Sequence, residues 1–196
     1  MRAWAEMFSR FLSARGVLEP YTDADYFAHV DGRPRYDGVR AFLASRGIIL
    51  EEGEDSDPGE QAPGAETVRG LGNRKNDLVL SLLRSEGVAP YPGTVAYLDS
   101  LPSDARLAIV SSSRNAEEVL RGAGLFDRFE HIVDGNVAAR EGLPGKPAPD
   151  TYLHGARLLG IDPAATVVYE DAVSGVRSGA AGDFGAVIGV DRGAGA

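Results

Sequence analysis

The sequence has no cysteine and almost no lysine. Without cysteine the chain can form no disulfide, thiol nucleophile or thiolate metal site, which is compatible with a reducing cytoplasm. Of its 20 basic residues, all but Lys75 and Lys146 are arginine. An ammonium group is a compact point charge that the forked guanidinium of arginine does not replace. In so arginine-rich a chain, the two lysines are therefore informative positions.

Long apolar runs and an excess of positive charge are also missing. No stretch approaches the roughly 18 apolar residues of a membrane-spanning helix, and the first residues lack the apolar core of a secretion signal. The formal net charge is −9, which is unfavourable for binding nucleic acid. We therefore expect a cytoplasmic protein that binds neither membrane nor nucleic acid, and a monomer or weak dimer.

The first part of the chain, residues 1–87, has the pattern of a small helical domain. Apolar residues recur at helical spacing in residues 3–15, after Thr22, in residues 36–46 and in residues 74–86. Residues 51–64 carry six acids and no base among proline and glycine, which predicts a mobile, solvated loop. These helices suit a lobe that closes over an active site.

The second part, residues 88–196, alternates helices with short apolar strands. The predicted strands are residues 107–110, 131–133, 167–169 and 186–190, and the predicted helices are residues 94–101, 150–159, 175–181 and one that begins at Asn115. We expect Asn115 and Glu118 to form a capping box. Strands that alternate with helices predict a doubly wound parallel α/β sheet. Residues 193–196 are expected to be a frayed terminus.

Polar residues follow two of the predicted strands directly. The first strand runs into Ser111, and the third stops at Glu170 and Asp171. The carboxyl ends of strands in such sheets are where ligands bind. Two carboxylates there can hold a hard cation such as Mg²⁺, or they can merely cap the helix that follows. Taken alone, Ser111 is better interpreted as a turn serine at a strand end and Lys146 as a surface lysine.

The order of these features is itself a pattern: a strand then serine, a lysine in a proline-rich turn, and a strand then Glu-Asp. With G-K-P-A-P-D at residues 145–150 and V-V-Y-E-D-A-V-S-G-V-R-S-G-A at residues 167–180, it resembles the haloacid dehalogenase-like phosphohydrolases, in particular their β-phosphoglucomutase-like branch. R-A-W at residues 2–4, R-K-N-D at residues 74–77 and Y-P-G at residues 91–93 extend the likeness over nearly the whole chain. The resemblance implies a Rossmann-like core with a small helical cap.

The resemblance also implies a reaction: Mg²⁺-dependent phosphoryl transfer on a sugar phosphate through an aspartyl-phosphate. Such a reaction demands neutralised phosphoryl oxygens and an in-line geometry. On this basis Asp171 resembles the Mg²⁺ ligand, and Glu170 a second-shell or alternative ligand. Ser111 would donate its hydroxyl to a phosphoryl oxygen, and Lys146 would place a positive charge between nucleophile and phosphate.

The same resemblance implies residues that bind the rest of the substrate. A group beside Ser111 matches positions that contact a second phosphate: Ser112, Ser113, Arg114, which stands where lysine is usual, and Asn115. Arg35 matches the cap arginine that binds the non-transferring phosphate, and Lys75 a cap residue that faces the cleft. A mutase needs these residues, whereas a simple phosphatase does not.

The chain departs from the family pattern at its start. The family's first motif, D-x-D on the first core strand, supplies the nucleophile and the acid/base aspartate and should lie well before R-A-W. The segments 23–25 and 55–57 also read D-x-D, but they fit a helix start and a solvated turn. We expect the nucleophile upstream of Met1, and a core without that strand to form two half-sheets.

Two other functions stay open. A chain without a nucleophile could be a non-catalytic protein that binds phosphate or a sugar phosphate, although half-sheets with unpaired edges are physically unfavourable. A response-regulator-like or nucleotide-binding α/β domain is the third possibility. The chain lacks the G-x-G-x-x-G turn of a nucleotide-binding domain, and this interpretation leaves Lys146 unexplained.

Overall fold

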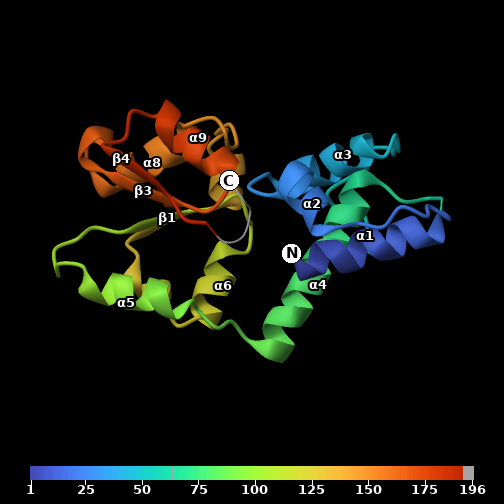
Figure 1. The fold of residues 1–196 in the computed structure, drawn as a ribbon, viewed down its shortest axis with the longest axis horizontal. Coiled ribbons are helices and arrows are strands. Elements are labelled where there is room, and N and C mark those ends of the chain that lie inside the picture. Colours follow the sequence, from blue (N-terminus) through green and yellow to red (C-terminus); the bar gives the residue numbers. More distant parts are fainter. Residues whose placement is uncertain (63, 192–196) are drawn as a thin grey trace. The chain divides into compact units, whose positions relative to one another are not determined.

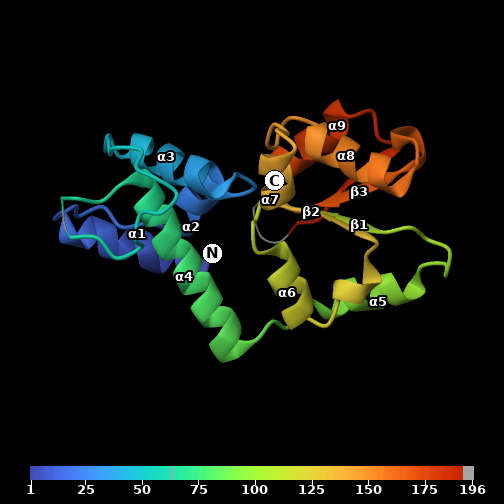
Figure 2. The same cartoon turned by 180° about the vertical axis from the view of Figure 1, so that it is seen from behind.

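The computed structural model describes residues 1–62 and 64–191, so the predicted frayed terminus at residues 193–196 lies outside the described residues. The chain divides into two compact units between Ser85 and Glu86. The sequence pattern predicts this boundary two residues later, after residue 87. We call them the N-terminal unit and the C-terminal unit. Figures 1 and 2 show the chain from opposite sides.

The N-terminal unit is helical, as predicted, and runs from blue to green in Figure 1. Its elements are α1 (Arg2–Ala14), the short α2 (Asp23–Asp25) continued by a π-helical turn (Tyr26–Val30), α3 (Arg35–Ser45) and α4 (Val68–Glu86). Helix α4 begins at Val68 rather than at the expected Arg74. Thr22 caps α2 in a capping box with Asp25, which explains why a helix starts there.

The core of this unit follows from the apolar stripe of α1. Met7, Phe8 and Phe11 are buried on that stripe, and the Phe8 ring lies 4.1 Å from the Phe42 ring of α3. Leu71 of α4 is also fully buried in this cluster. Removing so much apolar area from water is the main stabilising contribution to a helical unit of this size.

The acidic segment, described over residues 51–62, has no regular secondary structure but is fastened to α4. Asn73 donates to the backbone carbonyls of Asp55 and Asp57, at 3.1 and 2.8 Å, and Arg74 Nε donates to the Gly59 carbonyl at 2.7 Å. A Cβ on Gly59 would lie 2.8 Å from the Arg74 backbone, so glycine permits this close approach. Most residues of this segment are exposed, as expected for a solvated loop, but hydrogen bonds hold the segment against α4.

The C-terminal unit contains every predicted strand and one helix that the sequence did not predict. Its elements are α5 (Pro92–Ser100), β1 (Ala108–Val110), α6 (Ala116–Gly122), a 3₁₀ turn (Phe126–Arg128), β2 (His131–Val133), α7 (Gly135–Arg140), α8 (Asp150–Leu159), a 3₁₀ turn (Pro163–Ala165), β3 (Val167–Glu170), α9 (Val173–Ala181) and β4 (Ala186–Gly189). Helix α7 is the unpredicted one. Asn115 precedes α6 without a side-chain capping bond, so the predicted capping box was wrong.

All strand pairs among the described residues are parallel. Strand β1 pairs with β2, placing Val110 opposite Val133, and β3 pairs with β4, placing Tyr169 opposite Ile188. The pairs form two separate two-stranded sheets. Helix α8 packs on β1 and β2, and α9 on β3 and β4, whereas α5 and α6 lie on the other side of the strands in both views (Figures 1 and 2). The parallel α/β class is confirmed, in the form of the two half-sheets expected above.

Among the described residues, every helix is too short or too polar to cross a lipid bilayer.

Candidate active site

The Lys146 side chain links the carboxyl ends of two strands in the C-terminal unit. Its Nζ donates to the carbonyl of Val110, the last residue of β1, at 3.4 Å, and it forms an ion pair with Oε1 of Glu170, the last residue of β3. Ser111 and Asp171 are the next residues along the chain. The structure therefore brings Lys146 to the two strand ends from which Ser111 and Asp171 extend.

The Lys146–Glu170 ion pair is buried, since its side chains are only 5% and 9% exposed. The other carboxylate oxygen of Glu170 accepts hydrogen bonds from the backbone N–H groups of Asp171 at 2.6 Å and Ala172 at 2.8 Å. Burial alone would raise the pKa of Glu170, but the Lys146 charge and these hydrogen bonds hold that pKa below its usual value. The carboxylate is therefore ionised and held facing Lys146.

Tyr152 belongs to this cluster, and the sequence analysis missed it. Its hydroxyl accepts a hydrogen bond from Lys146 Nζ at 3.1 Å, and Nζ lies 4.7 Å from the centre of its ring. Burial, followed by the negative charge of Glu170, raises the pKa of Tyr152 above its usual value. The available signal was a polar-tipped aromatic on the buried face of α8, in line with Ala156 and Leu159.

The turn after β1 is held by serine hydroxyls. Ser111 Oγ accepts from the backbone N–H of Ser113 at 3.1 Å, and Ser113 Oγ accepts from that of Asn115 at 3.1 Å. The Ser111 N–H itself donates to the Val133 carbonyl of β2 at 2.9 Å. Ser111, Ser112, Ser113, Arg114 and Asn115 thus form one compact turn at the end of β1, although only Ser111 adjoins the residue that Lys146 contacts.

A second set of unpredicted residues, at the start of α7, supports this turn. The Gly135 N–H donates to the Ser113 carbonyl at 3.0 Å, and Asn136 Nδ2 donates to the Arg114 carbonyl at 2.9 Å. Asp134 is buried and caps α7 by accepting from the N–H groups of Asn136 and Val137. The sequence signal was the D-G-N triplet directly after a strand.

The turn that carries Lys146 is tied to helix α9. The Lys146–Pro147 peptide bond is cis, and the hydroxyl of Ser178, which is fully buried, donates to the Ala148 carbonyl at 2.6 Å. Helix α9 follows Asp171 directly. One helix therefore contacts the lysine turn and also adjoins the acidic pair.

The acidic pair does not offer two equivalent ligands to a cation. Both oxygens of Glu170 already accept hydrogen bonds from protein donors, whereas the Asp171 side chain is exposed. No cluster of three or more His, Cys, Asp or Glu residues that could hold a metal ion occurs in the described part of the chain. Mg²⁺ in phosphate sites is commonly held by one or two carboxylates together with waters and phosphate oxygens. Asp171 fits that role in this geometry, and Glu170 fits it less well.

Arg35 and Lys75 belong to the N-terminal unit and influence one another there. Arg35 donates to the side-chain oxygens of Asn76 at 2.8 Å and Asn73 at 3.4 Å. Lys75 Nζ lies 5.0 Å from the centre of the Trp4 ring. Burial, and next the Arg35 charge, lower the pKa of Lys75 to about 8. The two predicted cations of this unit therefore form one positively charged cluster.

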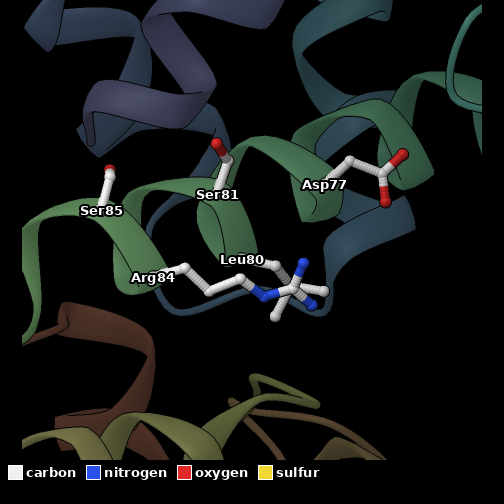
Figure 3. Close-up of a pocket in the computed structure, with 5 residues that line it drawn as sticks. All are labelled: Asp77, Leu80, Ser81, Arg84 and Ser85. Atoms are coloured by element: carbon white, nitrogen blue, oxygen red, sulfur yellow. The ribbon is translucent and has the colours of Figure 1, made fainter.

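An open hollow of about 540 Å³ is lined by five residues of α4, namely Asp77, Leu80, Ser81, Arg84 and Ser85. Figure 3 shows Ser81 and Ser85 projecting from one side of the helix, and Leu80 and Arg84 from another. None of the predicted site residues lines it. The chemistry of the chain is therefore better sought at the Lys146 cluster than in this hollow.

Comparison with known proteins identifies the class. A family model described as haloacid dehalogenase-like hydrolase matches residues 1–183. The chain belongs to this family of enzymes, which confirms the resemblance drawn from its motifs.

The relatives narrow the comparison within that family. Two proteins named β-phosphoglucomutase, from Mycobacterium bovis and Mycobacterium tuberculosis, are 45% identical over an alignment of 199 residues that covers 97% of this chain and 74% of each relative. Among solved structures, a β-phosphoglucomutase from Clostridium difficile matches with a TM-score of 0.72 at 22% identity, covering 95% of this chain and 75% of that one. CbbY from Rhodobacter sphaeroides, solved with xylulose-(1,5)bisphosphate, matches with a TM-score of 0.71 at 20% identity, covering 97% and 81%. At such identities the two structures support the fold.

Proposed function

We propose that this chain supplies phosphate-binding and cation-binding residues for Mg²⁺-dependent phosphoryl transfer on a sugar phosphate through an aspartyl-phosphate, in a β-phosphoglucomutase-like mutase or phosphatase. The β-phosphoglucomutases at 45% identity support the substrate class. The observation that carries the proposal is the position of Lys146, whose buried ammonium group joins the strand ends next to Ser111 and Asp171.

The assigned residues meet the main demand of phosphoryl transfer, which is to neutralise charge on the phosphoryl oxygens. Lys146 supplies a fixed positive charge, and the Ser111 hydroxyl can donate its proton to a phosphoryl oxygen while its lone pair receives the Ser113 N–H. When bound at Asp171, Mg²⁺ would supply further positive charge for the same oxygens. None of these residues is assigned as the nucleophile.

The choice between mutase and phosphatase rests on a second group of residues. Ser112, Ser113, Arg114 and Asn115 in the turn after β1 offer the hydroxyl, amide and cationic donors that a second phosphate group requires. Arg35 and Lys75 of the N-terminal unit are assigned to the non-transferring phosphate and to the substrate cleft by the family resemblance alone. Their number favours the mutase in this proposal.

The test supplies the purified chain with β-glucose 1-phosphate, Mg²⁺ and a glucose bisphosphate primer, and measures glucose 6-phosphate and free phosphate separately. Formation of glucose 6-phosphate supports the mutase. Release of free phosphate alone would leave the phosphatase and refute the mutase.

Lys146→Arg is the informative variant for this assay. Arginine keeps the positive charge but spreads it over a forked group that does not fit a site built for a compact ammonium. We expect at least a tenfold loss of turnover (about 1.4 kcal/mol in the barrier). Arg140→Lys, which exchanges a cation on the exposed side of α7, should leave turnover unchanged.

A second candidate function is non-catalytic binding of a sugar phosphate. One observation favours it: the assigned residues can bind and neutralise a phosphate, yet three protein donors hold the Glu170 carboxylate and Asp171 is assigned to the cation. Calorimetric binding of β-glucose 1-phosphate with no product in the assay above would establish this function in place of catalysis.

A further inference from the structure

The Tyr152 ring is buried against neighbouring side chains, and this packing does not require the hydroxyl group. Tyr152 lies in the first turn of α8 and is 7% exposed, and its ring meets the Phe184 ring edge-on at a centroid distance of 6.0 Å. A phenylalanine would fill the same space. The hydroxyl is therefore the part of this residue whose presence calls for an explanation.

That hydroxyl completes the set of acceptors around the Lys146 ammonium. An ammonium group has three N–H donors, and Lys146 has three acceptors among the described residues: the Glu170 carboxylate, the Tyr152 hydroxyl at 3.1 Å and the Val110 carbonyl at 3.4 Å. Tyr152 and Glu170 therefore accept hydrogen bonds from the same ammonium group.

The three hydrogen bonds are unequal. The contact with the Val110 carbonyl, at 3.4 Å, is longer than the usual range of about 2.7–3.2 Å and is therefore the weakest. Val110 directly precedes Ser111. The N–H that points toward the end of β1 is consequently the one that an incoming anion can take over at least cost, while Glu170 and Tyr152 keep the other two.

We infer that Tyr152 is a positioning residue: its hydroxyl, together with Glu170, orients the Lys146 ammonium so that the third N–H points to the end of β1 beside Ser111. The inference deepens the proposed function and rests on it only where phosphate binding is concerned. The orientation of Lys146 is a property of the protein by itself and can be tested separately.

The experiment compares Tyr152→Phe with Tyr97→Phe in the full chain. Both variants remove one hydroxyl from the C-terminal unit; Tyr97 pairs with Tyr169 on the exposed surface. The first readout is NMR of chains labelled with ¹³C at lysine Cε. The chain has only Lys75 and Lys146, so two signals are expected, and Lys75→Arg assigns them. Thermal unfolding confirms that each variant is folded.

We expect Tyr152→Phe to shift the Lys146 signal and leave the Lys75 signal in place, whereas Tyr97→Phe shifts neither. The second readout is calorimetric binding of inorganic phosphate. Loss of one hydrogen bond that orients Lys146 should raise the Kd for phosphate about fivefold in Tyr152→Phe, and Tyr97→Phe should not change it.

An unshifted Lys146 signal in folded Tyr152→Phe overturns the inference. A shifted Lys146 signal with an unchanged phosphate Kd overturns the link between Tyr152 and anion binding. If the unaltered chain binds no phosphate at all, the proposed function fails while the lysine signals still decide whether Tyr152 positions Lys146.

Discussion

Single residues in this chain couple stability to pH, and Glu170 does so through its buried ion pair. Its pKa is lower in the folded chain than the usual 4.5, so the folded state keeps the carboxylate ionised where the unfolded chain would protonate it. The resulting stabilisation is fully present above about pH 4.5 and is lost as the pH falls through the lower folded pKa.

We predict that Glu170→Gln lowers the free energy of unfolding by about 3 kcal/mol near pH 7, because it leaves the buried Lys146 charge without its counter-charge. Denaturant unfolding monitored by circular dichroism measures this. The variant should also lose less stability than the parent chain when the pH falls below about 4.5.

The matched control is Glu117→Gln, which breaks the Arg121–Glu117 pair on α6. The side chains of that pair are 55% and 58% exposed, and exposed pairs contribute less than about 1 kcal/mol. Equal losses in the two variants would contradict the special role of the buried pair.

Lys75 gives a second prediction at this scale. Its pKa of about 8, against the ordinary 10.5, means that the unfolded chain binds this proton more tightly. Holding the proton in the folded state therefore costs stability below pH 8, and that cost disappears as the pH rises from about 8 to 10.5. A pH titration of the ¹³Cε signal of Lys75 should show a midpoint near 8.

Arg35→Gln tests the cause of this shift. The variant removes the charge that is the second cause of the lowered pKa, so the Lys75 midpoint should move upward. Arg84→Gln removes a charge from α4, the helix that carries Lys75, about 13 Å from Lys75 along the helix axis. This variant should leave the Lys75 midpoint unchanged. An upward shift of equal size in both variants would argue against a specific Arg35 effect.

The sequence identified the charged residues of the cluster better than it identified their partners. Ser111 follows one predicted strand and Glu170 another, so their position at strand ends could be predicted from chain order, as could the place of Lys146 in a proline-rich turn. The contact of Tyr152 with Lys146 depends on how α8 turns back over the lysine, and the orientation of Glu170 depends on backbone N–H groups. Neither feature has a periodicity or a motif that predicts it.

Among whole elements, the junction between the turn after β1 and the start of α7 is packed without spare room. A Cβ on Gly135 would lie 2.9 Å from the Ser112 carbonyl oxygen and 2.9 Å from Arg114 Cγ. We predict that Gly135→Ala destabilises the chain by about 1–3 kcal/mol through overpacking and weakens phosphate binding, because the turn that carries the serines must move. Thermal unfolding and phosphate calorimetry measure the two effects.

Gly93→Ala is the control for this substitution. Gly93 also lies in the first turn of a helix, α5, but a Cβ there would meet nothing within 4 Å. Alanine should stabilise the folded chain by about 0.4–1 kcal/mol, because it lowers the conformational entropy of the unfolded chain. If Gly135→Ala changed neither the thermal stability nor the Kd for phosphate, the turn would tolerate displacement and the prediction would be wrong.

Elements with a clear apolar period were predictable, and short ones were not. Helix α8 has the predicted bounds, Asp150–Leu159, because its buried residues recur at helical spacing. Helix α7 has six residues and none is buried, so no apolar period marks it. Its start is fixed by the Asp134 cap.

At the scale of the whole molecule, the two units differ in how much they bury. Apart from Val133 and Ser178, the largest fully buried side chains all belong to the N-terminal unit. In the C-terminal unit Val167, Tyr169 and Ile188, on strands β3 and β4, are more than 40% exposed. Apolar burial is the main source of folding free energy, so we expect the N-terminal unit to be the more stable.

We predict two separate thermal transitions. Trp4, the chain's single tryptophan, reports the unfolding of the N-terminal unit. The first loss of far-ultraviolet circular dichroism should report the C-terminal unit, and the Trp4 fluorescence should change at a higher temperature. Amide hydrogen exchange should correspondingly be faster in β3 and β4 than in α1. One coincident transition for both probes would contradict independent units.

The alternation of elements could be predicted from local patterns, and so could the parallel class. Local patterns do not say which strands pair, and the prediction of two half-sheets relied on the family resemblance; the structure pairs β1 with β2 and β3 with β4. The fastening of residues 51–62 to α4 could not be predicted, because side chains such as Asn73 and Arg74 decide it and the composition of the segment suggests only solvation.

The hydroxyl of Ser178 has one more consequence. Helix α9 begins two residues after Asp171, and its Ser178 hydroxyl donates a hydrogen bond to the Ala148 carbonyl in the turn that carries Lys146. One helix therefore adjoins both the lysine turn and the exposed carboxylate, so a displacement of α9 would disturb the cation and the proposed metal ligand together.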